Sequence, residues 1–70
     1  MSFIELTKYL KYGSPGYKYP GKIILNTDFI VSIESKGIYT LVVLKDRREF
    51  KVKESALYIK KIIEETENNE

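Results

Sequence analysis

Apolar residues recur along this chain with two different periods, and the change from one to the other falls near Ser55. Before Ser55 they alternate with polar residues or form short runs rich in β-branched and aromatic side chains, as strands do. After it they follow the spacing of an amphipathic helix. We therefore expect one helix after five strands, at 3–7, 22–25, 29–34, 38–44 and 48–53.

This order predicts a mainly β protein of the α+β class. It has a small antiparallel sheet or partial barrel of about five strands, followed by one C-terminal helix that covers a face of the sheet or plugs one end. The strand at 38–44 is apolar on both faces, which favours a place in the middle of the sheet. A single domain spans 1–66, and an acidic tail at 67–70 is expected to fray.

The alternation also assigns side chains to faces, because successive residues of a strand point to opposite sides. In the first strand Ile4 and Leu6 face the core, whereas Glu5 and Thr7 face water. In the third strand the predicted split places Ile30, Ser32 and Glu34 on one face and Val31 and Ile33 on the other. The last strand and the helix are expected to bury Phe50, Val52, Ala56, Ile59, Ile62 and Ile63.

Short polar residues and glycine mark the turns. Asn26 is expected to end the second strand through a side-chain bond to nearby backbone, a local role rather than a ligand contact. Residues 35–37 are typical of a hairpin turn with the glycine at positive φ, and residues 46–47 form the next turn. Ser55 is a good helix N-cap, and Glu54 before it is expected to lie in solvent.

One segment departs from this regular pattern. Between positions 8 and 22 the chain carries four lysines, four of its six tyrosines, both prolines and three of its four glycines. We call residues 8–22 the Lys/Tyr loop. Hairpin connections usually take about two to five residues, so this one is longer than a simple connection needs. An extension on a compact scaffold is a natural place for a specific function.

Missing residue types restrict the chemistry. The chain has no His and no Cys, so it lacks the usual general base near neutral pH, the thiolate nucleophile and the common zinc ligands. No Gly-rich phosphate loop is present, and the carboxylates at 5, 28, 34, 46 and 49 look scattered over strand faces and turns. We therefore expect no enzymatic activity, no cofactor and no metal site.

Size and charge bear on the partners. Seventy residues bury a small core that no disulfide or zinc site reinforces, so a homo-oligomer is expected. Residues 1–53 carry ten Lys/Arg against five Asp/Glu, and residues 54–70 carry two against five. A basic body can attract phosphate or an acidic surface, and a solvated sheet face explains it as well. No export signal or membrane-length apolar segment is recognised, which favours a cytoplasmic protein without a membrane span.

The Lys/Tyr loop and the basic hairpin at 45–53 hold the candidate binding residues. Tyrosine offers a large contact area with few rotatable bonds, which suits protein interfaces. Interleaved Lys and Tyr can also hold a nucleic-acid strand by charge and stacking. A structural role stays open for the loop, with its rings on the sheet, and for the hairpin, as protection of a strand edge. The candidates are Tyr9, Tyr12, Tyr17, Lys18, Tyr19, Lys22, Arg47 and Arg48.

Several short motifs recur in an order known from one family. They are I-x-L-T at 4–7, L-N-x-D-x-I at 25–30, I-E at 33–34, T-x-x-x-L at 40–44, and V-K-E-S at 52–55 before an amphipathic helix. In this order they resemble the small flagellar and swarming motility protein family (FlbD-like), which implies a short, single-domain, non-enzymatic accessory protein of motility. Two features depart from the family pattern. Arg47 or Arg48 replaces the usual glycine of the last hairpin turn, and the Lys/Tyr loop is longer than the family's crossover.

Residues 24–50 also resemble the first half of a LytTR-type DNA-binding domain, an all-β domain that binds DNA with loops. The second half, with its F-x-R-x-H-R-S type motif, has no counterpart here. This second resemblance therefore implies a similar strand order and carries no DNA contacts over to the chain.

Together these features predict a non-enzymatic interaction module that binds a protein partner or copies of itself through the Lys/Tyr loop and an exposed strand edge. The closer resemblance implies a motility accessory role. Two alternatives stay open, namely a nucleic-acid-binding accessory protein and a small-molecule or nucleotide binder with its pocket at a subunit interface. Salt-dependent retention on heparin or DNA distinguishes the first alternative from the main prediction.

Overall fold

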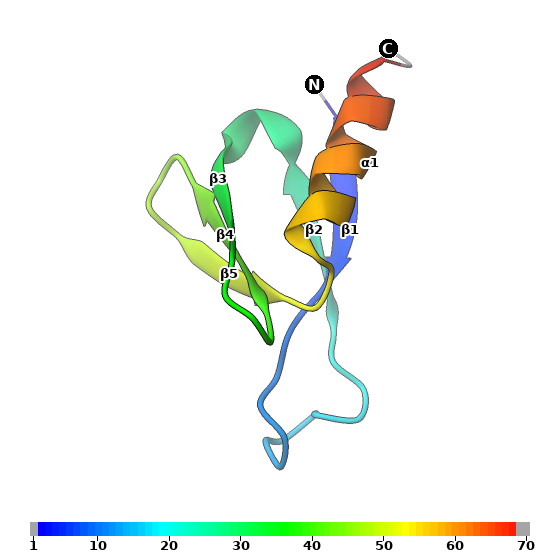
Figure 1. Ribbon diagram of the computed structural model, residues 1–70. Coiled ribbons are helices and arrows are strands. Elements are labelled where there is room, and N and C mark those ends of the chain that lie inside the picture. Colours follow the sequence, from blue (N-terminus) through cyan, green and yellow to red (C-terminus); the bar gives the residue numbers. More distant parts are fainter. Residues whose placement is uncertain (1, 69–70) are drawn as a thin grey trace.

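The computed structural model describes residues 2–68. In chain order the elements are β1 (Phe3–Thr7), β2 (Lys22–Asn26), the 3-10 helix η1 (Thr27–Phe29), β3 (Ile30–Ser35), β4 (Thr40–Leu44), β5 (Glu49–Val52) and α1 (Ala56–Asn68). All strand pairs are antiparallel. The predicted mainly β fold with one C-terminal helix is therefore confirmed (Figure 1).

Two sheets make up the β part. One holds β1 and β2, and the other has the order β3-β4-β5, so β4 lies in the middle as its apolar faces predict. The sheets meet where β1 ends. There the Tyr9 N–H donates to the Lys51 carbonyl and the Lys53 N–H to the Thr7 carbonyl, both at 2.9 Å. Because of this seam, the strands adjoin one another in the order β2-β1-β5-β4-β3, and the two sheets share one core.

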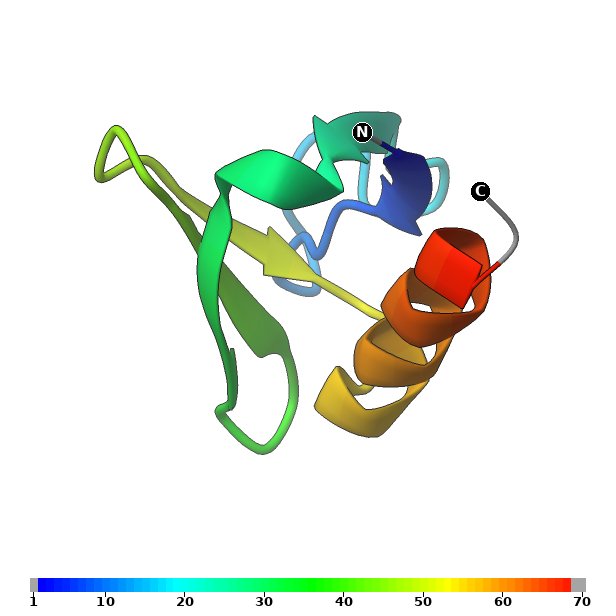
Figure 2. The same cartoon turned by 90° about the horizontal axis from the view of Figure 1, so that it is seen from above.

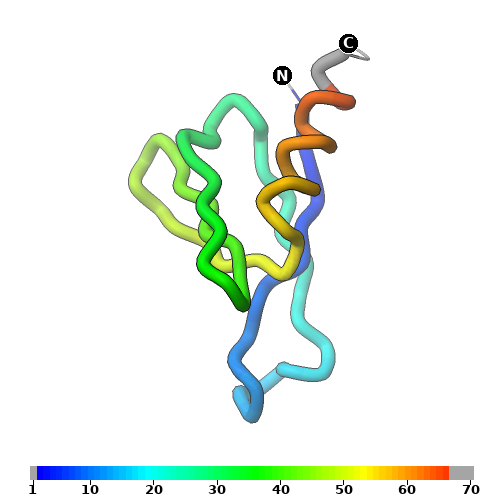
Figure 3. The backbone as a smooth tube through the Cα atoms, viewed as in Figure 1, coloured from blue at the N-terminus to red at the C-terminus, as the bar shows by residue number. Residues whose placement is uncertain are grey.

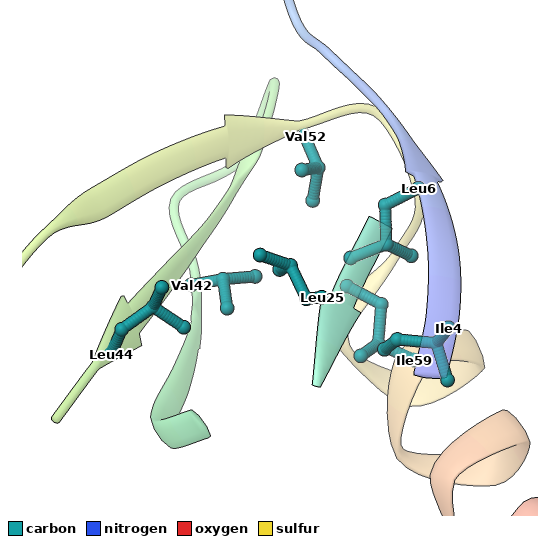
Figure 4. Close-up of a cluster of buried hydrophobic side chains, with 7 residues drawn as sticks. All are labelled: Ile4, Leu6, Leu25, Val42, Leu44, Val52 and Ile59. Carbon is teal, nitrogen blue, oxygen red and sulfur yellow. The ribbon is translucent and has the colours of Figure 1, made fainter. Parts of the chain in front are cut away.

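Seven apolar side chains form the buried core, and they converge from both sheets and the helix (Figure 4). β1 contributes Ile4 and Leu6, as its alternation predicts, and α1 contributes the fully buried Ile59. The remaining four are Leu25, Val42, Leu44 and Val52. Burial of one such side chain is worth about 1.5–3 kcal/mol, so Ile59 is the main anchor of the helix. Three side chains predicted for the core are half-buried against it: Phe50, Ile62 and Ile63.

The helix lies beside β1 and β3 and closes the core where Ile59 enters it (Figure 2). Its first turn is capped as predicted, since the Ser55 hydroxyl accepts from the Tyr58 N–H at 3.1 Å. It continues to Asn68, two residues beyond the predicted end of the domain at position 66. The predicted fraying concerns residues 67–70, and of these 69 and 70 lie outside the described residues. No helix within residues 2–68 is long and apolar enough to cross a membrane.

The predicted split of the third strand into two alternating faces is wrong. The register of β3 against β4 shifts between Ile30 and Ser32, as at a β-bulge. A bulge adds one residue to one strand and so reverses the alternation beyond it. Ile30 and Ile33 therefore both pack against the core, while Val31 between them is exposed.

Turns keep their predicted chemistry, with small shifts of the boundaries. The Asn26 side chain accepts from the Asp28 N–H at 2.9 Å and starts η1, so its predicted local role is confirmed. Gly37 has the predicted positive φ of 87°. The hairpin connection covers residues 36–39 rather than 35–37, because β4 begins at Thr40 and not at Ile38.

Glu54 is not the solvent-exposed residue that the sequence predicts. Its side chain is half-buried, and the Thr7 N–H donates to Oε1 at 2.9 Å and to Oε2 at 3.0 Å. The carboxylate therefore satisfies the last N–H of β1 from a position just before α1. It joins the start of the helix to the seam between the sheets.

Candidate functional site

The Lys/Tyr loop forms one end of an elongated molecule of 40 × 22 × 19 Å and extends away from the sheets (Figure 3). Its backbone is ordered by three successive turns, in which Ser14 donates to Lys11, Tyr17 to Ser14, and Tyr19 to Gly16, at 2.9–3.1 Å. Gly13 and Gly16 have φ values of 86° and 82°. Only glycine adopts such angles at little cost, which explains why the sequence places glycine at these two positions.

Three of the candidate tyrosines meet at the tip of this loop. Tyr12 and Tyr19 are 84% and 89% exposed. Tyr17 is half-buried and packs edge-on against Tyr12, with ring centroids 5.0 Å apart. These rings, together with Lys18, line a shallow pocket of about 410 Å³. The tip is therefore a preformed aromatic surface that includes one lysine.

Tyr9 has a different environment at the base of the loop. Its ring lies 5.4 Å from that of Tyr39, and the Lys51 ammonium lies 5.0 Å from the centroid of the Tyr39 ring. Its backbone N–H takes part in the seam between the sheets. Tyr9 therefore fixes the loop to β5 and does not belong to the tip.

Lys22 also serves the base of the loop. Its ammonium group donates to the Thr7 hydroxyl at 2.7 Å, across the first pair of the β1–β2 ladder. Thr7, which the sequence predicts to face water, is half-buried there. Of the six candidates in the loop, four are thus brought together at the tip and two lie at its base.

The last two candidates, Arg47 and Arg48, lie in the β4–β5 turn, apart from the loop tip (Figures 1 and 2). The Arg48 backbone N–H donates to Asp46 Oδ1 at 3.1 Å, and the Arg48 Nε–H donates to Asp46 Oδ2 at 2.6 Å. The backbone bond is the main reason why the pKa of Asp46 lies below its ordinary value of 3.8. The arginines and the loop tip therefore do not form one site.

Tyr39 is a contact of the candidate site that the sequence did not single out, whereas Lys51 beside it belongs to the predicted basic hairpin. Tyr39 lies outside the Lys/Tyr loop, and only the folded chain brings it beside Tyr9. Residues 8–22 contain no acidic residue, so the loop itself is purely basic. Within residues 2–68 no group of three or more Asp or Glu side chains is placed to hold a metal ion.

Comparisons with protein families, with curated proteins and with solved structures find no match to this chain.

Proposed function

We propose that the chain is a non-enzymatic cytoplasmic interaction module whose loop tip binds a protein partner, either another protein or a second copy of the chain. The observation that carries the proposal is the exposure of Tyr12 and Tyr19 on a segment ordered by its own turns. Exposed tyrosines on a preformed surface bury a large area at small entropic cost and are frequent anchors of interfaces. The resemblance to small motility proteins supports an accessory role in motility.

Partner capture tests the proposal directly. A photo-crosslinking phenylalanine analogue in place of Tyr19 is expected to capture a defined protein in the native host cell. The matched control places the same analogue at Ile24, an exposed apolar residue of β2. With the captured partner purified, Tyr12→Ala and Tyr19→Ala are each expected to weaken binding by about 1–2 kcal/mol. Equal labelling from both positions, or unchanged affinity of both variants, would count against the tip as the binding surface.

Shortening the loop separates binding from stability. Replacement of residues 11–18 by Asn-Gly removes Tyr12, Tyr17 and Lys18 and leaves Tyr19 without the neighbours that form the tip with it. It keeps the β1–β2 ladder and the adjoining bond from the Lys8 N–H to the Gly21 carbonyl at 3.0 Å. The shortened chain is expected to fold and to lose the partner. If it unfolds while association of the intact chain persists after Tyr12→Ala and Tyr19→Ala, the loop is a structural cover and the proposal is wrong.

A nucleic-acid partner is the competing outcome, favoured by the purely basic loop with Lys51 at its base. Retention on single-stranded DNA or heparin that falls steeply with salt, and that the shortened loop abolishes, would point to nucleic acid instead. Weak retention that the shortened loop leaves unchanged is expected if the partner is a protein.

A further inference from the structure

Helix α1 lies beside β3 (Figure 2), and side chains of both elements line a second surface. A groove of about 490 Å³ runs there, and we call it the β3–α1 groove. One wall consists of residues 30–33 of β3, and the other consists of four side chains of the helix: Ala56, Leu57, Lys60 and Ile63. The groove shares no residue with the loop tip.

The strand wall of this groove can accept a further strand. In the described part of the chain β3 pairs with β4 alone. An edge strand of an antiparallel sheet turns the N–H and C=O groups of alternate residues away from its partner. The sequence of β3, I-V-S-I-E-S, contains neither proline nor lysine. Of the features that protect a strand edge, β3 has a bulge after Ile30 and one charge, Glu34, which does not line the groove. Beyond the bulge, residues 32–35 keep a regular register against β4.

Apolar side chains cover both walls of the groove. Val31 is 63% exposed on β3 and Leu57 is 78% exposed on α1. Ile30, Ile33 and Ile63 line the groove with them and reach the core beneath. The helical spacing of the core residues of α1 leaves Leu57 outside the buried stripe, so packing within the chain does not explain a leucine at this position.

Charge and size define what fits. Lys60 is the only charged residue among the nine that line the groove. A volume of about 490 Å³ lies in the range of ligand pockets and gives room for a few apolar side chains of an extended segment. We propose that the groove binds an extended segment of a partner protein as an additional strand along β3, apolar at alternate positions and with an acidic residue opposite Lys60.

Selection from displayed random peptides of about ten residues tests this proposal without a known partner. Peptides selected on the intact protein are expected to alternate apolar residues and to carry Asp or Glu at one position. Val31→Lys places an ammonium group in the groove and is expected to weaken their binding roughly tenfold or more. Ile24→Lys is the matched control, because Ile24 is a similarly exposed strand residue, 66% against 63%, and does not line the groove. It is expected to leave binding unchanged.

Charge reversal at Lys60, in the helix wall of the groove, distinguishes specific peptide binding from nonspecific apolar adsorption. Selection on Lys60→Glu is expected to return Lys or Arg where the intact protein selects Asp or Glu. The bound peptide is also expected to slow hydrogen exchange of β3 amides, since it pairs with their edge. The chain with the shortened loop is expected to bind the same peptides, because the groove shares no residue with the loop tip. Failure of one of the two binding proposals therefore leaves the other standing.

Three results would overturn the proposal. The first is that no peptide is selected, and the second is that selected peptides bind Val31→Lys as well as they bind the intact protein. The third is a stable dimer that Val31→Lys dissociates and that excludes the peptides, which would assign the groove to a second copy of the chain.

Discussion

At the scale of single residues, Arg47 adopts a backbone conformation that its side chain disfavours. Its φ is 72°, and no other non-glycine residue of the described chain has a positive φ. Arg47→Gly is expected to raise the free energy of unfolding by about 1 kcal/mol in urea denaturation, because glycine accepts this angle without strain. Arg48→Gly is the control and is expected to give no gain, since it removes the side-chain bond to Asp46.

Glu54 holds a hydrogen bond whose loss leaves a partly buried donor unsatisfied. Glu54→Ala removes both acceptors of the Thr7 N–H and is expected to destabilise the fold by about 1–3 kcal/mol. Glu54→Gln keeps one acceptor oxygen and is expected to cost less. The same truncation at the exposed Glu49 is the control and is expected to have a much smaller effect. Equal effects of Glu54→Ala and Glu49→Ala on the urea midpoint would contradict the assigned role of Glu54.

The role of a single residue could be predicted from the sequence only where its interaction partner lies close to it along the chain. Asn26, Gly37 and Ser55 act on backbone within three residues, so their roles follow from local chemistry. The bond of Glu54 joins it to Thr7 across 47 positions. No local sequence pattern predicts such a contact, and none predicts the contact between the rings of Tyr9 and Tyr39.

At the scale of elements, side chains of α1 differ in burial, so their truncation is expected to destabilise the fold to different degrees. Ile59 is fully buried, Ile63 is half-buried and Leu57 is exposed. Ile59→Ala is therefore expected to cost about 2–4 kcal/mol, Ile63→Ala less, and Leu57→Ala least of the three. Ser55→Ala is expected to cost about 1 kcal/mol through loss of the cap. If Ser55→Ala or Leu57→Ala proved worse than Ile59→Ala in urea denaturation, the anchoring of the helix through Ile59 would be refuted.

Element types and their order could be predicted, but one register could not. The periodicity of β1, β4 and α1 matches their buried positions because these elements are regular. The bulge in β3 reverses the alternation after Ile30. The sequence of β3 contains no glycine that would indicate a bulge at Val31. The composition of residues 8–22 predicted a long loop at this place, whereas the β3–α1 groove arises only when two distant elements come together.

At the scale of the whole molecule, the seam between the sheets decides whether the fold is one cooperative unit. Few groups make it: two backbone bonds, at Tyr9 and Lys53, which together form the bridge of Lys8 with Val52, and the adjoining ring pair. The core nevertheless spans both sheets, since Leu6 of β1 and Val52 of β5 belong to the same buried cluster. Separation of the sheets would expose that cluster to water, at a cost of about 1.5–3 kcal/mol for each side chain uncovered.

We therefore expect the seam to open only when the whole chain unfolds. Native-state hydrogen exchange is expected to show the amides of Tyr9 and Lys53 exchanging with nearly the free energy of global unfolding, as do those of the central strand β4. The amides of Ser14, Tyr17 and Tyr19 bond only within the exposed loop and serve as the internal control, with faster exchange through local opening. If Tyr9 and Lys53 exchange as fast as the loop amides while β4 stays protected, the sheets open independently. In that case the β1–β2 hairpin and its loop could move against the rest of the protein, and a partner held at the loop tip would not be fixed relative to the β3–α1 groove.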